Sequence, residues 1–491
     1  MRNAASGILI NGEWVAPEAT YEVRNPARPS EVVGEFARAG PEHVDAAYRA
    51  ARDALAGWRR TPAIQRGEIL DRAAQLLAER TEDLATAFTR EEGKTIAETR
   101  VEVARGAQIL RYYAGETAQP RGEVHPSGFP GRFLYSVREP LGVVCLITPW
   151  NFPVAIPLWK IAPALAYGNT VVWKPATITP GCAVGVAEAL RDAGVPEGVL
   201  NLVTGPASAI GGSLTDHEEV DGISFTGSLE IGRQIQLRAV ERGVKVQLEL
   251  GGKNPVVVLP DADLDQAVEQ TVRGAMMSTG QKCTATSRAI LVGDGAERFV
   301  PRLLERVRAL RVGDPLRADV DVGPLASAEQ LETVLGYLDV AREEGHELAV
   351  GGRRLEEEGE GYFVEPTVYL DVDPASRIGR EEIFGPVLGV LRAASLEEAL
   401  EIANSVEFGL SASIFTRDIR EAFEFIDAVE AGVVHVNSET AGAEPQVPFG
   451  GVKASSSHSR EQGKAAAEFY TRLKTVYLDM PPAEEPGRPP R

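Results

Sequence analysis

Short apolar runs alternate with longer amphipathic stretches from about Gly142 onward. This alternation is typical of βαβ units around a parallel sheet. Residues 180–193 and 231–242 are expected to be helices, because each stretch begins soon after a turn signal. The runs expected to be buried strands of a first lobe are VVCLI, TVVW, VLNLV, GISF and VQLEL, at residues 143–147, 170–173, 199–203, 222–225 and 246–250.

A second alternation of the same kind follows Cys283. It predicts a fold of the α/β class with two doubly wound, Rossmann-like lobes, and the chemistry is expected where the lobes meet. The strands expected in this second lobe are AILV, VLGVL, SASIF and VVHV, at residues 289–292, 387–391, 411–415 and 433–436. The helices expected between them span residues 297–311, 396–403 and 419–429.

The first 115 or so residues are expected to be mainly helical and to cover the first lobe. Residues 44–58 and 66–88 carry the 3.6-residue apolar period of amphipathic helices. Two extended segments have no obvious partner, one within residues 120–140 and the other at residues 471–480. Two such strands predict a β-arm that pairs with another subunit, and therefore a homodimer or homotetramer.

Charge and cysteine content narrow the function classes. The 491 residues include 51 basic and 71 acidic side chains, a net charge of −20. This balance argues against a general nucleic-acid or membrane-surface role. The chain shows neither a secretory signal nor an apolar run of membrane-spanning length, so a cytoplasmic location is expected. Three scattered cysteines and six histidines without ligand spacing predict no disulfide framework and no metal site.

Three polar residues near predicted strand or helix ends are candidates for catalysis. Cys283, in GQKCTATSR, is either a buried filler, as isolated cysteines often are, or a partly exposed thiol among small polar neighbours. Glu249, in LELGGKNP, is either an exposed carboxylate at a strand end or a buried general base. Asn151, in ITPWNFP, is either a turn residue or an amide donor to an oxyanion.

The sequence lacks the G-x-G-x-x-G dinucleotide fingerprint. In FTGSLEIG, however, a predicted strand leads through Gly227 and Ser228 into a helix. Those residues are either a plain helix cap or a site where backbone N–H groups meet a pyrophosphate. Lys174 and Thr177, in WKPAT, lie at another strand end, where the lysine is either solvated or within reach of a ribose or its phosphate.

Seven motifs carry a resemblance that covers nearly the whole chain, from NGEWV to KTVYL. ITPWNFP, WKPA, FTGS with the later Gly232, LELGGKNP, GQKC, EEIFGPV and PFGGVK occur in the order and at the separations typical of the aldehyde dehydrogenase superfamily. The resemblance implies that Cys283 is the nucleophile, Glu249 the general base and Asn151 the oxyanion donor. It also implies NAD or NADP as cofactor and an aldehyde as the small-molecule substrate.

The same resemblance implies a set of cofactor-binding residues. Glu382 and Phe384 are similar to the pair that contacts the nicotinamide ribose, and Lys174 to the lysine at the adenine ribose. Thr177 stands where strongly NAD-preferring relatives often have a glutamate, so NADP is expected to be accepted alongside NAD. The remaining implied contacts are Ile147, Thr148, Trp150, Ala176, Gly205, Phe225, Gly227, Ser228, Ile231, Leu250 and Gly251.

GQKCTATSR, FGLSASIFT and PFGGVKASSSHSREQG most resemble the group that oxidises 2,5-dioxopentanoate, α-ketoglutaric semialdehyde, to 2-oxoglutarate. The expected substrate contacts are Arg105, Trp159, Ser457 and His458. Dehydrogenases of succinic or glutaric semialdehyde are the alternative, although the arginines of the succinic type are missing here. A CoA-acylating enzyme is a further alternative, although such enzymes usually lack the glutamate at Glu249.

The expected division of the chain follows from these assignments. Residues 1–118 and 140–251 are predicted to form a cofactor-binding domain, and residues 252–450 a catalytic domain. Residues 119–139 and 451–480 are predicted to form the oligomerisation arm and a C-terminal segment. The tail at residues 481–491, PPAEEPGRPPR, is expected to be disordered because it cannot bury apolar surface.

Overall fold

Two seven-stranded sheets form the framework of the protein, and the computed structural model describes residues 7–16 and 18–479. The first sheet has the order β11-β10-β7-β8-β9-β1-β2, in which the five strands from β11 to β9 run parallel. All five strands predicted for the first lobe are confirmed. Its strands are β1 (Ile8–Ile10), β2 (Glu13–Trp14), β7 (Val143–Ile147), β8 (Thr170–Lys174), β9 (Leu200–Val203), β10 (Gly222–Thr226) and β11 (Lys245–Glu249).

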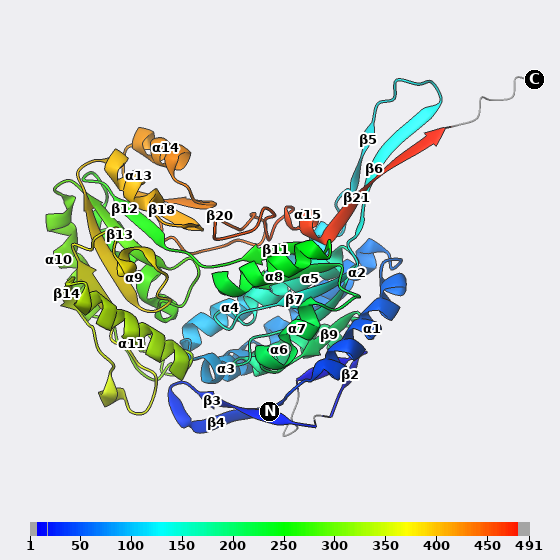
Figure 1. The fold of residues 1–491 in the computed structure, drawn as a ribbon, viewed down its shortest axis with the longest axis horizontal. Helices are drawn as coiled ribbons and strands as arrows, with labels where there is room; N and C mark the ends of the chain where they lie inside the picture. The colour runs from blue at the N-terminus through cyan, green and yellow to red at the C-terminus, as the bar shows by residue number, and fades with distance from the viewer. Residues whose placement is uncertain (1–6, 17, 480–491) are drawn as a thin grey trace, which may run out of the picture.

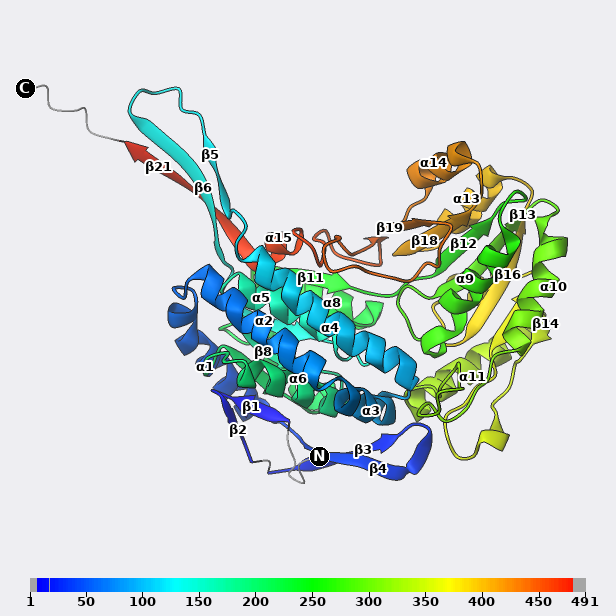
Figure 2. The same cartoon turned by 180° about the vertical axis from the view of Figure 1, so that it is seen from behind.

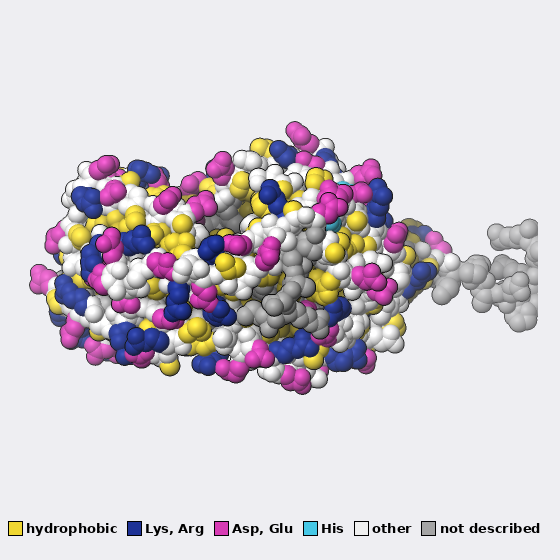
Figure 3. All heavy atoms as spheres, turned by 90° about the horizontal axis from the view of Figure 1, so that it is seen from below, with side chains coloured by type: hydrophobic (Ala, Val, Ile, Leu, Met, Phe, Trp, Pro, Cys, Tyr) yellow, Lys and Arg dark blue, Asp and Glu magenta, His cyan; other side chains and the backbone are white. Residues whose placement is uncertain are grey.

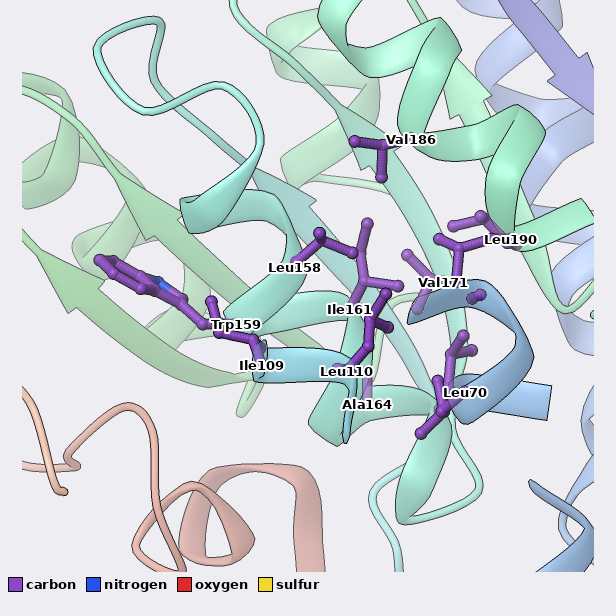
Figure 4. Close-up of a cluster of buried hydrophobic side chains, with 14 of the residues drawn as sticks. Leu70, Ile109, Leu110, Leu158, Trp159, Ile161, Ala164, Val171, Val186 and Leu190 are labelled. Atoms are coloured by element: carbon purple, nitrogen blue, oxygen red, sulfur yellow. The ribbon is translucent and has the colours of Figure 1, made fainter. Parts of the chain in front are cut away.

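Helices cover both faces of this sheet because its strands are apolar on both sides. On one face Leu70, Leu110, Ile161 and Leu190 pack around Val171 of β8 (Figure 4). They come from α2 (Ala63–Glu79), α4 (Ile96–Glu116), α5 (Ala155–Ala166) and α6 (Pro180–Asp192). The other face is covered by α1 (Pro41–Trp58), α7 (Ala207–Thr215) and α8 (Leu229–Glu241). Full coverage is what a buried parallel sheet requires.

The second sheet has the order β14-β15-β16-β13-β12-β18-β19, in which only the edge strand β14 is antiparallel. The four strands predicted for the second lobe are confirmed within it. The strands are β12 (Asn254–Val258), β13 (Thr286–Val292), β14 (Glu347–Val350), β15 (Thr367–Leu370), β16 (Val387–Ala393), β18 (Ser411–Phe415) and β19 (Val433–Val436). The helices beside them are α9 (Leu264–Met276), α10 (Gly295–Arg308), α11 (Ala328–Glu343), α12 (Arg377–Arg380), α13 (Leu396–Asn404) and α14 (Ile419–Ala428).

A three-stranded antiparallel sheet projects from the first lobe as an arm (Figures 1 and 2). It consists of β5 (Gly122–His125), β6 (Arg132–Pro140) and β21 (Thr471–Asp479). The two extended segments predicted from the sequence are therefore each other's partners, with β21 paired along the whole of β6. The arm joins the body at α15 (Ala466–Tyr470), and its pairing with another subunit stays a prediction.

The N-terminal region was predicted to be mainly helical. It also contains strands, and the second predicted helix is broken in two. Besides β1 and β2, β3 (Thr20–Asn25) and β4 (Arg28–Ala37) form a hairpin beneath the first lobe (Figure 1). The single helix expected at residues 66–88 is wrong, since α2 ends at Glu79 and α3 (Thr81–Glu92) begins after Arg80. The Thr81 hydroxyl donates to the Leu77 and Ala78 carbonyls, which competes with the helical hydrogen bonds there.

Two further findings concern the surface and the chain end. Among the described helices, none is long and apolar enough to cross a membrane. On the face drawn in Figure 3, acidic and basic side chains are intermixed rather than gathered into a patch of one sign. The tail predicted at residues 481–491 lies outside the described residues. The remaining short elements are β17 (Phe408–Gly409), β20 (Val452–Lys453), η1 (Met277–Gly280) and η2 (Glu356–Glu358).

Candidate active site

The carboxyl ends of the first sheet bring the candidate residues of that lobe together. The strand order changes direction between β10 and β7, and ligands of open α/β sheets bind outside the carboxyl ends at such a point. Asn151 follows β7, Gly227 follows β10, Lys174 ends β8 and Glu249 ends β11. Strands that lie far apart in the sequence therefore present these side chains at one edge.

The second sheet meets this edge with its amino ends. Cys283 lies just before β13, and Glu382 and Phe384 lie just before β16. The lobes are joined by residues 250–253 between β11 and β12, where Asn254 Nδ2 donates to the Cys283 carbonyl at 2.9 Å. A Cβ on Gly252 would lie 2.6 Å from that carbonyl, so glycine permits the close approach.

Asn151 is the residue that connects the first sheet to the cysteine loop. Its side chain is 3% exposed, and its Nδ2 donates to the Gln281 carbonyl at 3.0 Å, two residues before Cys283. A side-chain amide has two N–H donors. One is used by Gln281, which leaves the second for an oxygen atom bound beside the cysteine.

The Cys283 thiol is partly exposed, unlike Cys145 and Cys182, which are buried. Desolvation by its surroundings, together with the nearby Glu382 and Glu249 carboxylates, raises the pKa of Cys283 to about 12. The thiol is therefore protonated near neutral pH, and a base must take its proton before it reacts as a thiolate.

Glu249 is buried at the end of β11, with 2% of its surface exposed. The Ser456 hydroxyl donates to its Oε2 at 2.6 Å, and within the described residues its Oε1 has no hydrogen-bond partner. Burial, and secondarily the Glu461 carboxylate, raise the pKa of Glu249 well above its ordinary value. A carboxyl group with a raised pKa and a free oxygen is suited to take a proton from water.

A buried ion pair that sequence reasoning missed lies behind Glu249. Lys160 of α5 is fully buried and pairs with Glu461, and its Nζ also donates to the Ser224 hydroxyl at 2.8 Å. The positive charge of Lys160 opposes the rise in the pKa of Glu249. The sequence did carry a signal, because Lys160 is the one polar residue in the apolar helix AIPLWKIAPALA. A lysine in such a helix needs a buried partner.

The residues at the first sheet fit a dinucleotide. The Ser228 side chain makes no cap hydrogen bond to α8, so the N–H groups of the first helical turn are free to bind a phosphate. Lys174 is 4% exposed, its Nζ donates to the Pro175 carbonyl at 2.9 Å, and burial lowers its pKa to about 8. The Thr177 hydroxyl donates to the Gly205 carbonyl at 3.2 Å, which brings two predicted cofactor residues together.

Glu382 and Phe384 lie beside the cysteine loop and line a small cavity with Gly252 and Lys282. Glu382 Oε1 accepts a hydrogen bond from Gly252 N at 2.9 Å, and burial raises the pKa of this carboxyl to about 7. Phe384 has a φ of 59° and meets the Trp150 ring edge-on, with centroids 5.5 Å apart.

The other predicted cofactor residues differ in exposure. Thr148 is buried and its hydroxyl accepts from Trp173 Nε1 at 2.9 Å, whereas Ile231 is 44% exposed on α8. Those at the strand ends or just beyond them are Ile147, Ala176, Phe225, Leu250 and Gly251.

The predicted substrate residues do not form one cluster. Trp159 packs against Phe449 with ring centroids 5.4 Å apart, and Arg105 is half-buried on α4 without a recorded ion pair or hydrogen bond among the described residues. Ser457 is held beside β11, where its hydroxyl accepts from Leu248 N at 2.9 Å, and His458 is exposed.

In the part of the chain that the structure describes, no three His, Cys, Asp or Glu side chains are grouped so as to hold a metal ion.

Comparison with known proteins places the chain in one family. The sequence profile of the Aldehyde dehydrogenase family matches residues 14–476. An alpha-ketoglutaric semialdehyde dehydrogenase from Bacillus subtilis (strain 168) is 49% identical over 474 residues, 96% of this chain and 97% of that protein. A 2,5-dioxopentanoate dehydrogenase from Saccharolobus solfataricus is 44% identical over 456 residues, 92% of this chain and 95% of that protein. The crystal structure of betaine aldehyde dehydrogenase from Staphylococcus aureus in complex with NAD+ has a TM-score of 0.94 at 35% identity, covering 97% of this chain and 95% of that one.

Proposed function

The chain belongs to the aldehyde dehydrogenase family and is an NAD(P)-dependent aldehyde dehydrogenase, and we propose that its substrate is 2,5-dioxopentanoate, which it oxidises to 2-oxoglutarate. The observation that carries the substrate proposal is the near full-length similarity, at 49% and 44% identity, to two enzymes named for this aldehyde. The site geometry supports a mechanism through Cys283.

In this mechanism Cys283 Sγ bonds to the aldehyde carbon after its proton passes to a base. The carbonyl oxygen becomes an oxyanion, and the free N–H of Asn151, together with the Cys283 backbone N–H, donates to it. NAD(P), which Lys174, Glu382 and Phe384 would hold, would supply the acceptor for the hydride lost from the former aldehyde carbon. Loss of that hydride leaves a thioester on Cys283.

Glu249 completes the proposed reaction as the base for hydrolysis. Its free Oε1 takes a proton from a water molecule, the water oxygen bonds to the thioester carbon, and the Cys283–carbon bond breaks to release the acid. The presence of this buried carboxylate favours hydrolysis over transfer of the acyl group to CoA, because CoA transfer requires that water stay unactivated.

We propose that Arg105 binds the distal carboxylate of the substrate. Arg105 and Ile109 lie on the same face of α4, one helical turn apart, and Ile109 lies beside Trp159 (Figure 4). The same helix touches the cysteine loop at its N-terminal end, where Glu98 binds Ser278, roughly 10 Å along the helix axis from Arg105. Along α4, Arg105 therefore lies between the residue that binds the cysteine loop and the residue beside Trp159, which supports the proposal.

We propose that NADP serves as well as NAD. Thr177 places no carboxylate near the ribose, so a 2′-phosphate meets no like charge, and the buried Lys174 supplies a positive one. A preference for NAD of roughly tenfold or more in kcat/KM, about 1.4 kcal/mol, would contradict this assignment.

The proposed substrate is tested by kcat/KM values for 2,5-dioxopentanoate, succinic semialdehyde, glutaraldehyde and betaine aldehyde with both cofactors. We expect dioxopentanoate to have the highest value, and a clear lead for succinic semialdehyde would refute the substrate assignment. Arg105→Ala should raise KM for dioxopentanoate about tenfold, or about 1.4 kcal/mol, and leave a neutral aldehyde within about twofold. Arg111→Ala, an exposed arginine on the same helix, is the matched control.

A further inference from the structure

Lys94 is a buried lysine outside the residues used so far. It lies between α3 and α4 and is 4% exposed. Its Nζ donates to the backbone carbonyl of Asn151 at 2.6 Å and to Glu102 Oε2 at 2.6 Å. The same ammonium group lies 4.0 Å from the centroid of the Phe152 ring. Lys94 therefore binds the turn that carries the proposed oxyanion donor.

Glu102 connects the same ion pair to the start of the next helix, α5. Its second oxygen, Oε1, accepts hydrogen bonds from Val154 N at 2.8 Å and Ala155 N at 3.2 Å, at the start of α5. A carboxylate at a helix N-terminus satisfies N–H groups that have no partner within the helix. One ion pair thus holds residues 151–155 at both ends.

The first turns of α4 also hold the cysteine loop. Glu98 Oε1 accepts from Ser278 N at 2.6 Å, and its other oxygen accepts from Thr95 N at 3.1 Å at the helix start. Ser278 and Thr279 both have a φ of 54°, which costs free energy for residues other than glycine and persists only where neighbours enforce it. The same helix end therefore positions the loop of Cys283 and the turn of Asn151 relative to each other.

The Lys94–Glu102 ion pair is better explained by the orientation that it gives to the Asn151 turn than by a contribution to the free energy of unfolding. A buried ion pair gains little net free energy over a well-packed apolar pair, because both charges lose their hydration. Besides the bond between its two members, this pair makes three hydrogen bonds to the segment 151–155, to the Asn151 carbonyl and from Val154 N and Ala155 N. It fixes the backbone from which the Asn151 amide projects, and with it the direction of the free N–H.

We propose that Lys94 is a positioning residue that aims the Asn151 amide at the oxyanion through the Asn151 backbone carbonyl. The inference rests on the proposed function, in which Asn151 is the oxyanion donor. Loss of one oxyanion donor costs about 100- to 1000-fold in kcat, and a misplacement of about 1 Å costs about 100-fold. Lys94→Met should accordingly lower kcat about 10- to 100-fold and leave the aldehyde KM within about threefold.

A double-mutant cycle tests this inference with purified full-length enzyme, NADP, and two aldehydes, dioxopentanoate and a neutral one. If Lys94 acts through Asn151, adding Lys94→Met to Asn151→Ala should change kcat by less than about threefold. Both aldehydes should show the same loss for Lys94→Met, because every aldehyde forms the oxyanion. The alkylation rate of Cys283 by iodoacetamide should stay within about twofold, since Lys94 does not touch the thiol.

Two further variants control for folding. Arg100→Met removes an exposed ion pair between the same two helices, with Glu82 at 2.8 Å, and should leave kcat unchanged. If Lys94→Met fails to fold, the combined Lys94→Met and Glu102→Gln variant carries the test, because it leaves no unpaired buried charge and keeps acceptors for α5.

The outcomes separate the inference from the function on which it rests. An equal loss of kcat from Lys94→Met with and without the Asn151 amide would overturn the inference, and so would a parallel loss of thiol alkylation. Wild-type kcat in Asn151→Ala would instead overturn the oxyanion role of Asn151, and the role of Lys94 with it.

Discussion

The hydrogen bond from Ser456 to Glu249 sets the pH at which the proposed base works. The Ser456 hydroxyl donates to Glu249 Oε2 at 2.6 Å and itself accepts from Gly451 N at 2.6 Å. It stabilises the charged carboxylate, which holds the pKa of Glu249 lower than burial alone would. Ser456→Ala removes this donor and leaves the rest of the loop in place.

The size of the effect follows from that one contact. A hydrogen bond to a charged group is worth about 1.5–3 kcal/mol, and about 1.4 kcal/mol corresponds to one pKa unit. The pKa of Glu249 should therefore rise by about 1–2 units in Ser456→Ala. Because the carboxylate is the reactive form, the acid limb of the pH–rate profile should move to higher pH by the same amount, with a loss of about 10- to 100-fold at neutral pH.

The assay is the pH dependence of kcat and kcat/KM from pH 5.5 to the alkaline limit of stability, for wild type, Ser456→Ala and Ser459→Ala. Ser459 is the matched control, since its hydroxyl accepts from Gln247 Nε2 at 3.3 Å and has no recorded contact with Glu249. We expect the Ser456→Ala rates to approach wild type at alkaline pH. An unshifted midpoint, or a loss of the same size at every pH, would refute the reasoning.

Three other predictions follow from the same site. Gly280→Ala should destabilise the protein by about 2 kcal/mol or more in urea unfolding, because φ is +66° and a Cβ would lie 2.1 Å from the Gly385 carbonyl; an unchanged midpoint would contradict this. Alkylation of Cys283 by iodoacetamide should accelerate about tenfold per pH unit from pH 7 to 9, because its thiol pKa of about 12 leaves little thiolate; a plateau near pH 8 would argue against it. The pKa of Lys174 is lowered to about 8, so its charge is present below pH 8 and lost above it. The ratio of KM for NADP to KM for NAD should therefore rise between pH 7 and 9 in wild type and stay flat in Lys174→Met.

Most strands at the centre of both sheets were predictable because their apolar runs are continuous and bounded by turn residues, although β12 and β15 were not among those predicted. The short strands β1 and β2 at one side of the first sheet were not: β1 pairs with β9 from a distant part of the sequence, and residues 8–10 carry too few positions for a period to emerge. The helix break at Arg80 could not be predicted either, because α2 and α3 keep the same helical period on either side of it.

The site residues likewise divide into those that a general rule could place from the sequence and those that it could not. Residues after β7, β8, β10 and β11 could be placed by the rule that ligands bind at the carboxyl ends of parallel strands. Cys283 and Glu382 lie at the amino ends of the second sheet, where that rule does not apply, and only the ordered motifs pointed to them. Lys94 and Glu102 were missed because their roles depend on contacts with the Asn151 turn, about fifty positions further along the chain.

The C-terminal segment has a consequence for the order in which the protein matures during synthesis. Phe469 and Tyr470 of α15 are buried in the core between the first sheet and α2, α4 and α5, and Glu461 pairs with Lys160 in the same lobe. The ribosome makes the strands of the first sheet well before these residues. Until the second lobe has been synthesised, the core of the first lobe therefore lacks Phe469 and Tyr470, and Lys160 lacks its partner Glu461. A nascent chain that ends before residue 456 lacks both the Ser456 hydroxyl at Glu249 and the Lys160–Glu461 ion pair behind it, so the surroundings of the proposed base are complete only once residues 456–461 have been made.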